Sequence, residues 1–219
     1  SGIKLQPFYS PADVRNLDAE RDLGAPGHFP FTRGIDGELY RREPWIMRLP
    51  VVSGRPQDTH AQIQTLGNFG PMALRLIPDR PTQAGFDSDD PVAQGQVGRH
   101  GVAIDSLWDM ECLLAGVPLT KTNVLIQANT AGGVLLAIYL AAAERLGFRP
   151  GQLKGVVQND VLDDVLIRRT AALPLPAAMK LVAETANFCR QTLKGFIPLS
   201  IAQPQLTSDT TRPESLAWL

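Results

Sequence analysis

The feature that most constrains the fold of this chain is a repeated alternation of strand-like and helix-like segments after residue 72. Short apolar runs have the length of strands, and the segments between them show helical periodicity, three of them ending close to a glycine. Such a repeat is typical of parallel strands joined by right-handed crossovers. The predicted strands are 73–77, 123–128, 154–158 and 195–202, and the predicted helices are 105–115, 130–146, 161–171 and 176–193.

About four strand–helix units predict an α/β fold that is a partial TIM-type (β/α) barrel. A closed barrel of this kind takes about eight strands, so four leave two edges that another element must pair or cover. We therefore expect a homodimer or a partner chain to complete the barrel, unless the ends of this chain cover the edges. The helix at 130–146 is apolar on nearly all sides, which predicts burial or contact with another subunit.

The parts outside the repeat predict an N-terminal arm at 1–71, a half-barrel at 72–202 and a C-terminal tail at 203–219. The arm is rich in proline, glycine and aromatic residues and shows little periodicity. Ser10 as N-cap and Pro11 at the first helical position predict one short helix that ends near Gly24. Between 29 and 50, arginines are spaced among aromatic residues, as in a loop that holds an anion.

The composition excludes several classes of partner. The formal net charge is −1, which gives no electrostatic reason to expect nucleic acid or an anionic membrane. The longest apolar run, 131–143, is shorter than the roughly 20 residues that span a bilayer. The two cysteines lie far apart, and the three histidines fall in Gly/Pro-rich or polar stretches typical of surface histidines. We therefore expect free thiols, a cytoplasmic location and no metal site.

Three stretches carry a resemblance to a known family. They are YSPADVRNLDAERDLGAPGHFPFTRGI, DRPTQAGFDSDDPVAQGQVGRHGVAIDSLWDMECLLAGVPL and KGVVQNDVL. The chain resembles the methylmalonyl-CoA mutase family of adenosylcobalamin-dependent acyl-CoA mutases from about Tyr9 to Ile201. The resemblance covers the arm and the first four strand–helix units of the family's catalytic barrel. It implies a barrel that admits the pantetheine arm of CoA along its axis, with the reaction at the carboxyl ends of the strands.

The resemblance also implies where a thioester and a cofactor bind. Thr32 and Arg33 lie in a kept PFTRG segment, and Arg48 matches an arginine of the CoA-binding segment, so all three are candidates for CoA or phosphopantetheine contacts. The family's cobalamin domain ligates the metal through a histidine in an Asp-x-His-x-x-Gly pattern. This pattern does not occur in the chain, so adenosylcobalamin is not expected to be held within it.

Several family positions carry other residues here. The substrate-contacting tyrosine of the family is Pro50, and the arginine that pairs with the substrate carboxylate falls at Ile138. The stretch LSIAQPQ, which aligns with the family's histidine-bearing segment, has no histidine. A buried carboxylate needs a paired cation, and an oxyanion needs a donor, so the resemblance predicts that radical mutase chemistry is lost.

Polar residues at the predicted strand ends are the candidate catalytic groups: Asp79, Gln127, Asn129 and Asp160. The carboxyl ends of barrel strands are where such enzymes keep their chemistry. Asp160, within Gln158-Asn159-Asp160, is equally explained as the cap of the helix that starts at Val161. For Asp79, a structural ion pair with Arg80 is the alternative.

Three functions remain open on this basis. The first is a mutase-like domain that binds or acts on an acyl thioester of CoA or a carrier protein, as a repurposed isomerase or lyase. The second is a component of a genuine cobalamin-dependent acyl-CoA mutase, completed by another chain. The third is a non-catalytic subunit that serves dimerisation or docking.

Overall fold

The computed structural model describes residues 6–42, 45, 48–51, 54–67, 73–165 and 172–201. They fall into two compact units that divide between residues 46 and 47. The predicted tail at 203–219, and the end of the predicted helix at 161–171, lie outside the described residues. No helix among those described is long and apolar enough to cross a membrane.

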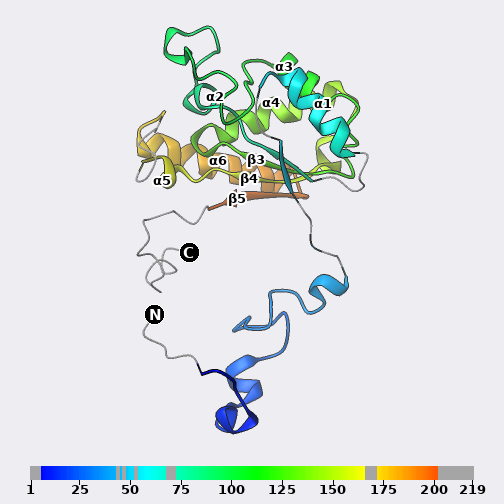
Figure 1. The fold of residues 1–219 in the computed structure, drawn as a ribbon, viewed down its shortest axis with the longest axis vertical. Helices are drawn as coiled ribbons and strands as arrows, with labels where there is room; N and C mark the ends of the chain where they lie inside the picture. Colours follow the sequence, from blue (N-terminus) through cyan, green and yellow to red (C-terminus); the bar gives the residue numbers. More distant parts are fainter. Residues whose placement is uncertain are drawn as a thin grey trace. The chain divides into compact units, whose positions relative to one another are not determined.

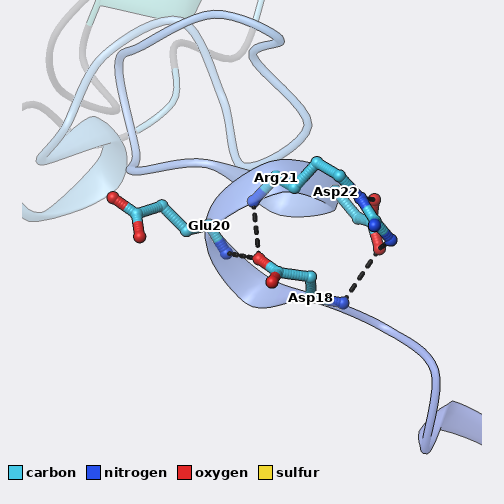
Figure 2. Close-up of polar contacts among 4 residues, drawn as sticks. All are labelled: Asp18, Glu20, Arg21 and Asp22. Carbon is cyan, nitrogen blue, oxygen red and sulfur yellow. Dashed lines mark hydrogen bonds and ion pairs between the residues drawn. The ribbon is translucent and has the colours of Figure 1, made fainter.

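The first unit contains short helical segments instead of the single helix predicted near its start. A 3-10 turn at Pro11–Val14 is followed by a π-helical turn at Ala19–Leu23, and a second 3-10 turn lies at Leu39–Arg41. The prediction of one continuous helix was wrong because Asp18 starts a new helical segment. Its carboxylate accepts hydrogen bonds from the backbone N–H groups of Glu20 and Arg21, which is the geometry of an N-cap (Figure 2).

Asp22 completes this turn from its other end. Its carboxylate accepts a hydrogen bond from the backbone N–H of Asp18 at 2.9 Å and pairs with Arg21. The side-chain hydrogen bond from Arg21 and the backbone bond from Asp18 lower the pKa of Asp22 from its ordinary value. The start of the unit is held by Asp13, whose carboxylate accepts from the backbone N–H and the hydroxyl of Ser10.

The second unit is built on a five-stranded parallel sheet in the order β1-β2-β3-β4-β5. Its strands are β1 (Leu49–Val51), β2 (Ala73–Leu76), β3 (Asn123–Gln127), β4 (Lys154–Gln158) and β5 (Phe196–Ser200). Its α-helices are α1 (Pro56–Gly67), α2 (Arg80–Ala84), α3 (Leu107–Leu114), α4 (Gly132–Arg145), α5 (Val161–Asp163) and α6 (Leu175–Thr192). Short 3-10 turns lie at Pro91–Ala93, Asn129–Ala131 and Pro150–Gln152.

The strand order identifies the type of sheet. The strands follow one another in sequence order without reversal, and Figure 1 shows the helices gathered on one side of the sheet. A doubly wound sheet would reverse direction and carry helices on both faces, whereas a barrel adds each strand to the same edge. The α/β fold class and the partial TIM-type barrel are therefore confirmed. The four predicted strands are present as β2 to β5.

The unit formed by β1 and α1 was not predicted. The strand has only three residues, one of them Pro50, and pairs with β2 through Leu49 and Leu74. Proline lacks a donor for the ladder and is tolerated at a sheet edge, where β1 lies. A short strand that contains proline has no periodicity that a sequence pattern can detect.

The hydrophobic core lies between the sheet and its helices. The largest fully buried side chains include Leu74, Leu76, Ile126 and Tyr139. Helix α4 packs against α3, α6 and strands β3 and β4, so most of its apolar surface is buried inside the unit. Burial was one of the two alternatives predicted for this helix.

Candidate functional site

The sheet has a second face on which no described helix packs, and we call it the open face. Side chains alternate between faces along each strand. On β3, Val124 and Ile126 are buried in the core, whereas Leu125 and Gln127 are partly buried and lie outside the core cluster. The strand registers extend the open face across the sheet. Its members are Arg75 on β2, Asn123, Leu125 and Gln127 on β3, Lys154, Val156 and Gln158 on β4, and Ile197 on β5.

One polar pair lies on the open face close to the carboxyl ends of the strands. The Nε of Arg75 donates to Oε1 of Gln127 at 2.6 Å, and both side chains are partly buried. Gln127 was predicted as a site residue. Arg75 was not, although its alternation with Leu74 and Leu76 in the sequence would have placed it on the face opposite the core.

A second polar pair lies at the amino end of the same face. Nη2 of Arg48 donates to Oδ1 of Asn123, the first residue of β3, at 2.7 Å. Asn123 and Gln127 are four residues apart along β3, which corresponds to about 13 Å at the rise of a β-strand. Leu125 lies between them. The open face therefore carries an arginine–amide pair at each end of an apolar centre.

A buried polar network lies at the carboxyl ends of β3 and β4. The side-chain N–H groups of Asn129 donate to Asp163 at 3.0 Å and Asp164 at 2.9 Å, and its oxygen accepts from Gln158 at 3.1 Å. Asp164 also accepts from the backbone N–H and hydroxyl of Thr130 at 3.0 and 2.7 Å. Asn129 has a φ of 45°, a conformation that asparagine tolerates better than most residues.

Two of the predicted site residues, Asn129 and Asp160, each form a hydrogen bond with Asp163. Asp160 is the N-cap of α5, and its carboxylate accepts from the backbone N–H of Asp163 at 3.1 Å. This is the capping alternative that the sequence left open. Asn129 is 2% exposed and its amide is fully engaged, so its observed contacts hold the loops after β3 and β4 together.

Asp79 lies apart from this network, in a structural arrangement of its own. One carboxylate oxygen accepts from the backbone N–H of Thr82 at 3.0 Å and caps α2, and the other accepts from Gly98 at 2.7 Å. Gly101 passes so close to the segment after β2 that an added Cβ would clash with the carbonyl oxygen of Pro78. Asp79 thus fastens the loop at 85–106 to the end of β2. Among the ion pairs of the described residues, none joins Asp79 to Arg80, the structural alternative predicted for it.

The candidate thioester contacts are divided between the two units. Thr32 and Arg33 belong to the first, where the Thr32 hydroxyl donates to the carbonyl of Leu23 and Arg33 shares a shallow pocket with Glu38 and Arg41. Arg48 belongs to the second, at the amino end of the open face.

The network contains residues that the sequence analysis did not single out. Thr130, Asp163 and Asp164 all contribute buried hydrogen bonds, and Asn159 is 2% exposed with its Nδ2 donating to the carbonyl of Pro198 on β5. The side-chain oxygen of Asn159 has no hydrogen-bond partner among the described atoms. The signal for Asp163 and Asp164 was present in the sequence, because they follow Gln158-Asn159-Asp160 by about one helical turn.

The resemblance implied that the residue at position 138 would contact the acyl group, but the structure places Ile138 elsewhere. It lies on α4, on the helix side of the sheet, and packs against the hydrophobic core. A residue at this position therefore does not line the open face. The absence of an arginine at 138 says nothing about whether a cation is available where an acyl group would lie.

Metal binding has no support among the described residues. They contain no group of three or more His, Cys, Asp and Glu side chains that could hold a metal ion. The carboxylates at the strand ends are engaged with amide, hydroxyl and backbone donors.

Comparisons with known proteins agree on one family. A sequence model described as methylmalonyl-CoA mutase matches residues 1–209. The 2-hydroxyisobutanoyl-CoA mutase large subunit of Aquincola tertiaricarbonis is 34% identical over 209 residues, 95% of this chain and 37% of the relative. The methylmalonyl-CoA mutase of Escherichia coli is 34% identical over 92% of this chain and 28% of the relative.

The relatives include an animal protein, and this chain again covers only part of its length. The mitochondrial methylmalonyl-CoA mutase of Mus musculus is 33% identical over 92% of this chain but only 26% of its own length. The chain thus spans between 26% and 37% of these relatives. With the family model covering most of its residues and a barrel-type sheet in place, the chain belongs to the methylmalonyl-CoA mutase family.

Proposed function

We propose that this chain binds an acyl thioester, of CoA or of a carrier-bound phosphopantetheine, along the open face of its sheet. The observation that carries the proposal is the pair of arginine–amide contacts at opposite ends of that face, Arg48 with Asn123 and Arg75 with Gln127. A phosphopantetheine arm is an extended chain of methylene and amide groups with a phosphate at one end and the acylated sulfur at the other. Polar ends around an apolar centre suit that chemistry.

The direction of the thioester follows from the strands. Barrel enzymes place their reacting groups at the carboxyl ends of the strands, which puts the acyl group near Arg75 and Gln127. The phosphate end then lies toward Arg48, whose guanidinium is a good phosphate ligand. In this proposal Gln127 contacts the substrate, whereas Asp79, Asn129 and Asp160 hold the loops that shape the site.

We further propose that this chain does not by itself carry out a radical rearrangement. None of the five described strands contains a tyrosine or a histidine, the residue types that orient the substrate in the family. Pro50 stands in β1 where the resemblance expects a tyrosine and has no side-chain donor. The chemistry left to the chain is binding, orientation and exclusion of water from the thioester.

A second candidate is a component of a genuine cobalamin-dependent mutase, with the rest of the barrel on another chain. The specific observation is the chain's share of its relatives, 37% or less, together with a sheet whose end strands β1 and β5 each have one described neighbour. Unpaired strand edges are usually paired or covered. A partner chain or a second copy that supplies the remaining strands would meet both conditions.

Turnover in the presence and absence of adenosylcobalamin separates the two candidates. We expect the purified chain to bind acyl-CoA thioesters and to leave their acyl skeletons unchanged, with or without the cofactor, as measured by mass spectrometry of the acyl group. If rearrangement requires both the cofactor and a co-purifying chain, the second candidate is correct. Rearrangement by this chain with cofactor and no partner would contradict the proposed loss of radical chemistry.

A further inference from the structure

We propose that a cavity beside α2 binds a small zwitterion, a molecule that carries an ammonium group and a carboxylate on an apolar body. The cavity has a volume of about 420 Å³, within the range of small-molecule sites. Among the described residues it shares none with the open face. The proposal therefore goes beyond thioester binding and does not depend on it.

The first observation is an apolar wall that the fold leaves uncovered. The cavity lies between α2, the loop that follows it and the end of α5. Pro81, Phe86 and Val92 contribute to the wall, and the last two are 39% and 60% exposed. Protein interiors hold few voids larger than a water molecule, so a cavity of this size with an apolar wall is suited to an organic ligand.

The second observation is a buried carboxylate that lines the cavity without a cation. Asp164 is 5% exposed, and its three hydrogen bonds come from neutral groups of Asn129 and Thr130. No ion pair of the described residues includes it. Its Oδ1 accepts one of the three bonds, and a carboxylate oxygen has room for two. An ammonium group in the cavity would supply both a further hydrogen bond and the missing positive charge.

The third observation is a guanidinium that lines the same cavity. Arg80, the first residue of α2, is exposed, and it takes part in none of the ion pairs found in the described parts of the chain. A guanidinium binds a carboxylate through two parallel hydrogen bonds. Arg80 and Asp164 thus line one cavity without pairing with each other, which leaves space between their charges for a ligand.

The two opposite charges select the class of ligand. A simple anion would be attracted by Arg80 and repelled by Asp164, and a simple cation would meet the reverse. A molecule with both charges can pair with both side chains, while its hydrocarbon part covers Phe86 and Val92. Amino acids with an apolar side chain, and longer amino-carboxylates, have this chemistry.

The test titrates two zwitterions calorimetrically into the full-length protein with any chain that co-purifies. L-leucine and ε-aminocaproate are isomers that hold the same two charges at different separations. Isocaproate and isoamylamine each lack one charge of leucine, and caproate and pentylamine do the same for ε-aminocaproate. We expect at least one zwitterion to bind about tenfold or more tightly than both of its single-charge analogues.

Two variants assign the charges to their side chains. Arg80→Gln should lower the affinity for the zwitterion to that of its amine analogue, and should leave the affinity for the amine within about twofold of wild type. Asp164→Asn should lower the affinity for the zwitterion to that of its carboxylate analogue. Arg190→Gln is the matched control, because Arg190 is an exposed arginine of α6 that lines a different pocket, beside β5. It should leave every affinity unchanged, and thermal unfolding should show that all variants are folded.

The possible outcomes decide between the two proposals separately. If neither zwitterion binds, or if a single-charge analogue binds as tightly, the inference is wrong. An affinity for the zwitterion that is unchanged in Arg80→Gln, or that falls equally in Arg190→Gln, would also overturn it. A parallel titration with butyryl-CoA tests the proposed function. If butyryl-CoA fails to bind while the zwitterion binds as expected, the proposed function is wrong and this inference stands.

Discussion

Replacing Asp164 with alanine is expected to lower the free energy of unfolding of the sheet unit by about 3–5 kcal/mol, the loss typical of a broken buried polar network. The carboxylate accepts three hydrogen bonds, from the Asn129 amide, the Thr130 backbone N–H and the Thr130 hydroxyl. Asp164 is 5% exposed and both donor residues are buried, so water cannot replace the lost acceptor at low cost. Urea denaturation followed by circular dichroism measures the change.

Two further variants test whether the loss of stability comes from the buried hydrogen bonds of Asp164. Asp164→Asn keeps one acceptor oxygen and should fall between wild type and Asp164→Ala. Asp89→Ala removes an exposed carboxylate from the loop at 85–106 and should change stability by no more than about 0.5 kcal/mol. A loss below about 1 kcal/mol for Asp164→Ala would show that the network does not hold the strand ends together.

Replacing Leu125 with glutamate is expected to weaken acyl-CoA binding by about 100-fold, or roughly 2.7 kcal/mol, while the sheet unit stays folded. Leu125 is partly buried at the centre of the open face, beside Arg75 in the strand register. A carboxylate there would place a charge at the apolar centre of the open face, against the apolar part of the bound thioester. Calorimetric titration with butyryl-CoA measures the loss.

Met179→Glu is the matched control, because it makes the same kind of change at a methionine that is 48% exposed on α6, on the helix side. It should leave the affinity within about twofold of wild type. Equal effects of the two substitutions, or unchanged affinity in Leu125→Glu with an intact fold, would count against the open face as the binding surface.

The sequence predicted the sheet well because its strands are buried on the helix side and interrupted by clear helix signals. β2 to β5 coincide with the predicted strands to within a few residues, and α3 lies within the helix predicted at 105–115. β1 was missed because three residues that include Pro50 carry no detectable pattern. The first unit was predicted with one helix because Asp18 is equally compatible with a helix interior and with the start of a new turn.

The site was harder to predict, because the type of residue does not reveal its partner. Aspartate at the end of a strand serves as a base or as a helix cap with the same side chain, and Asp79 and Asp160 both make capping contacts. Gln127 and Asn129 are two residues apart in sequence, yet Gln127 is partly buried and bonded to Arg75, whereas Asn129 is 2% exposed in the network at the strand ends. A turn with positive φ at Asn129 causes this difference, and strand periodicity does not extend through such a turn.

Protection of a thiol on the open face tests the central claim most directly. In a Cys112→Ser background, Leu125→Cys and Met179→Cys place one reactive thiol on each side of the sheet; Cys189 is buried, and burial raises the pKa of its thiol, so it reacts slowly. Modification by a maleimide is timed with and without an acyl-CoA at a concentration that saturates binding. We predict that the thioester slows modification at position 125 by about tenfold or more and leaves position 179 unchanged. Saturating thioester with no protection at position 125 would contradict the account.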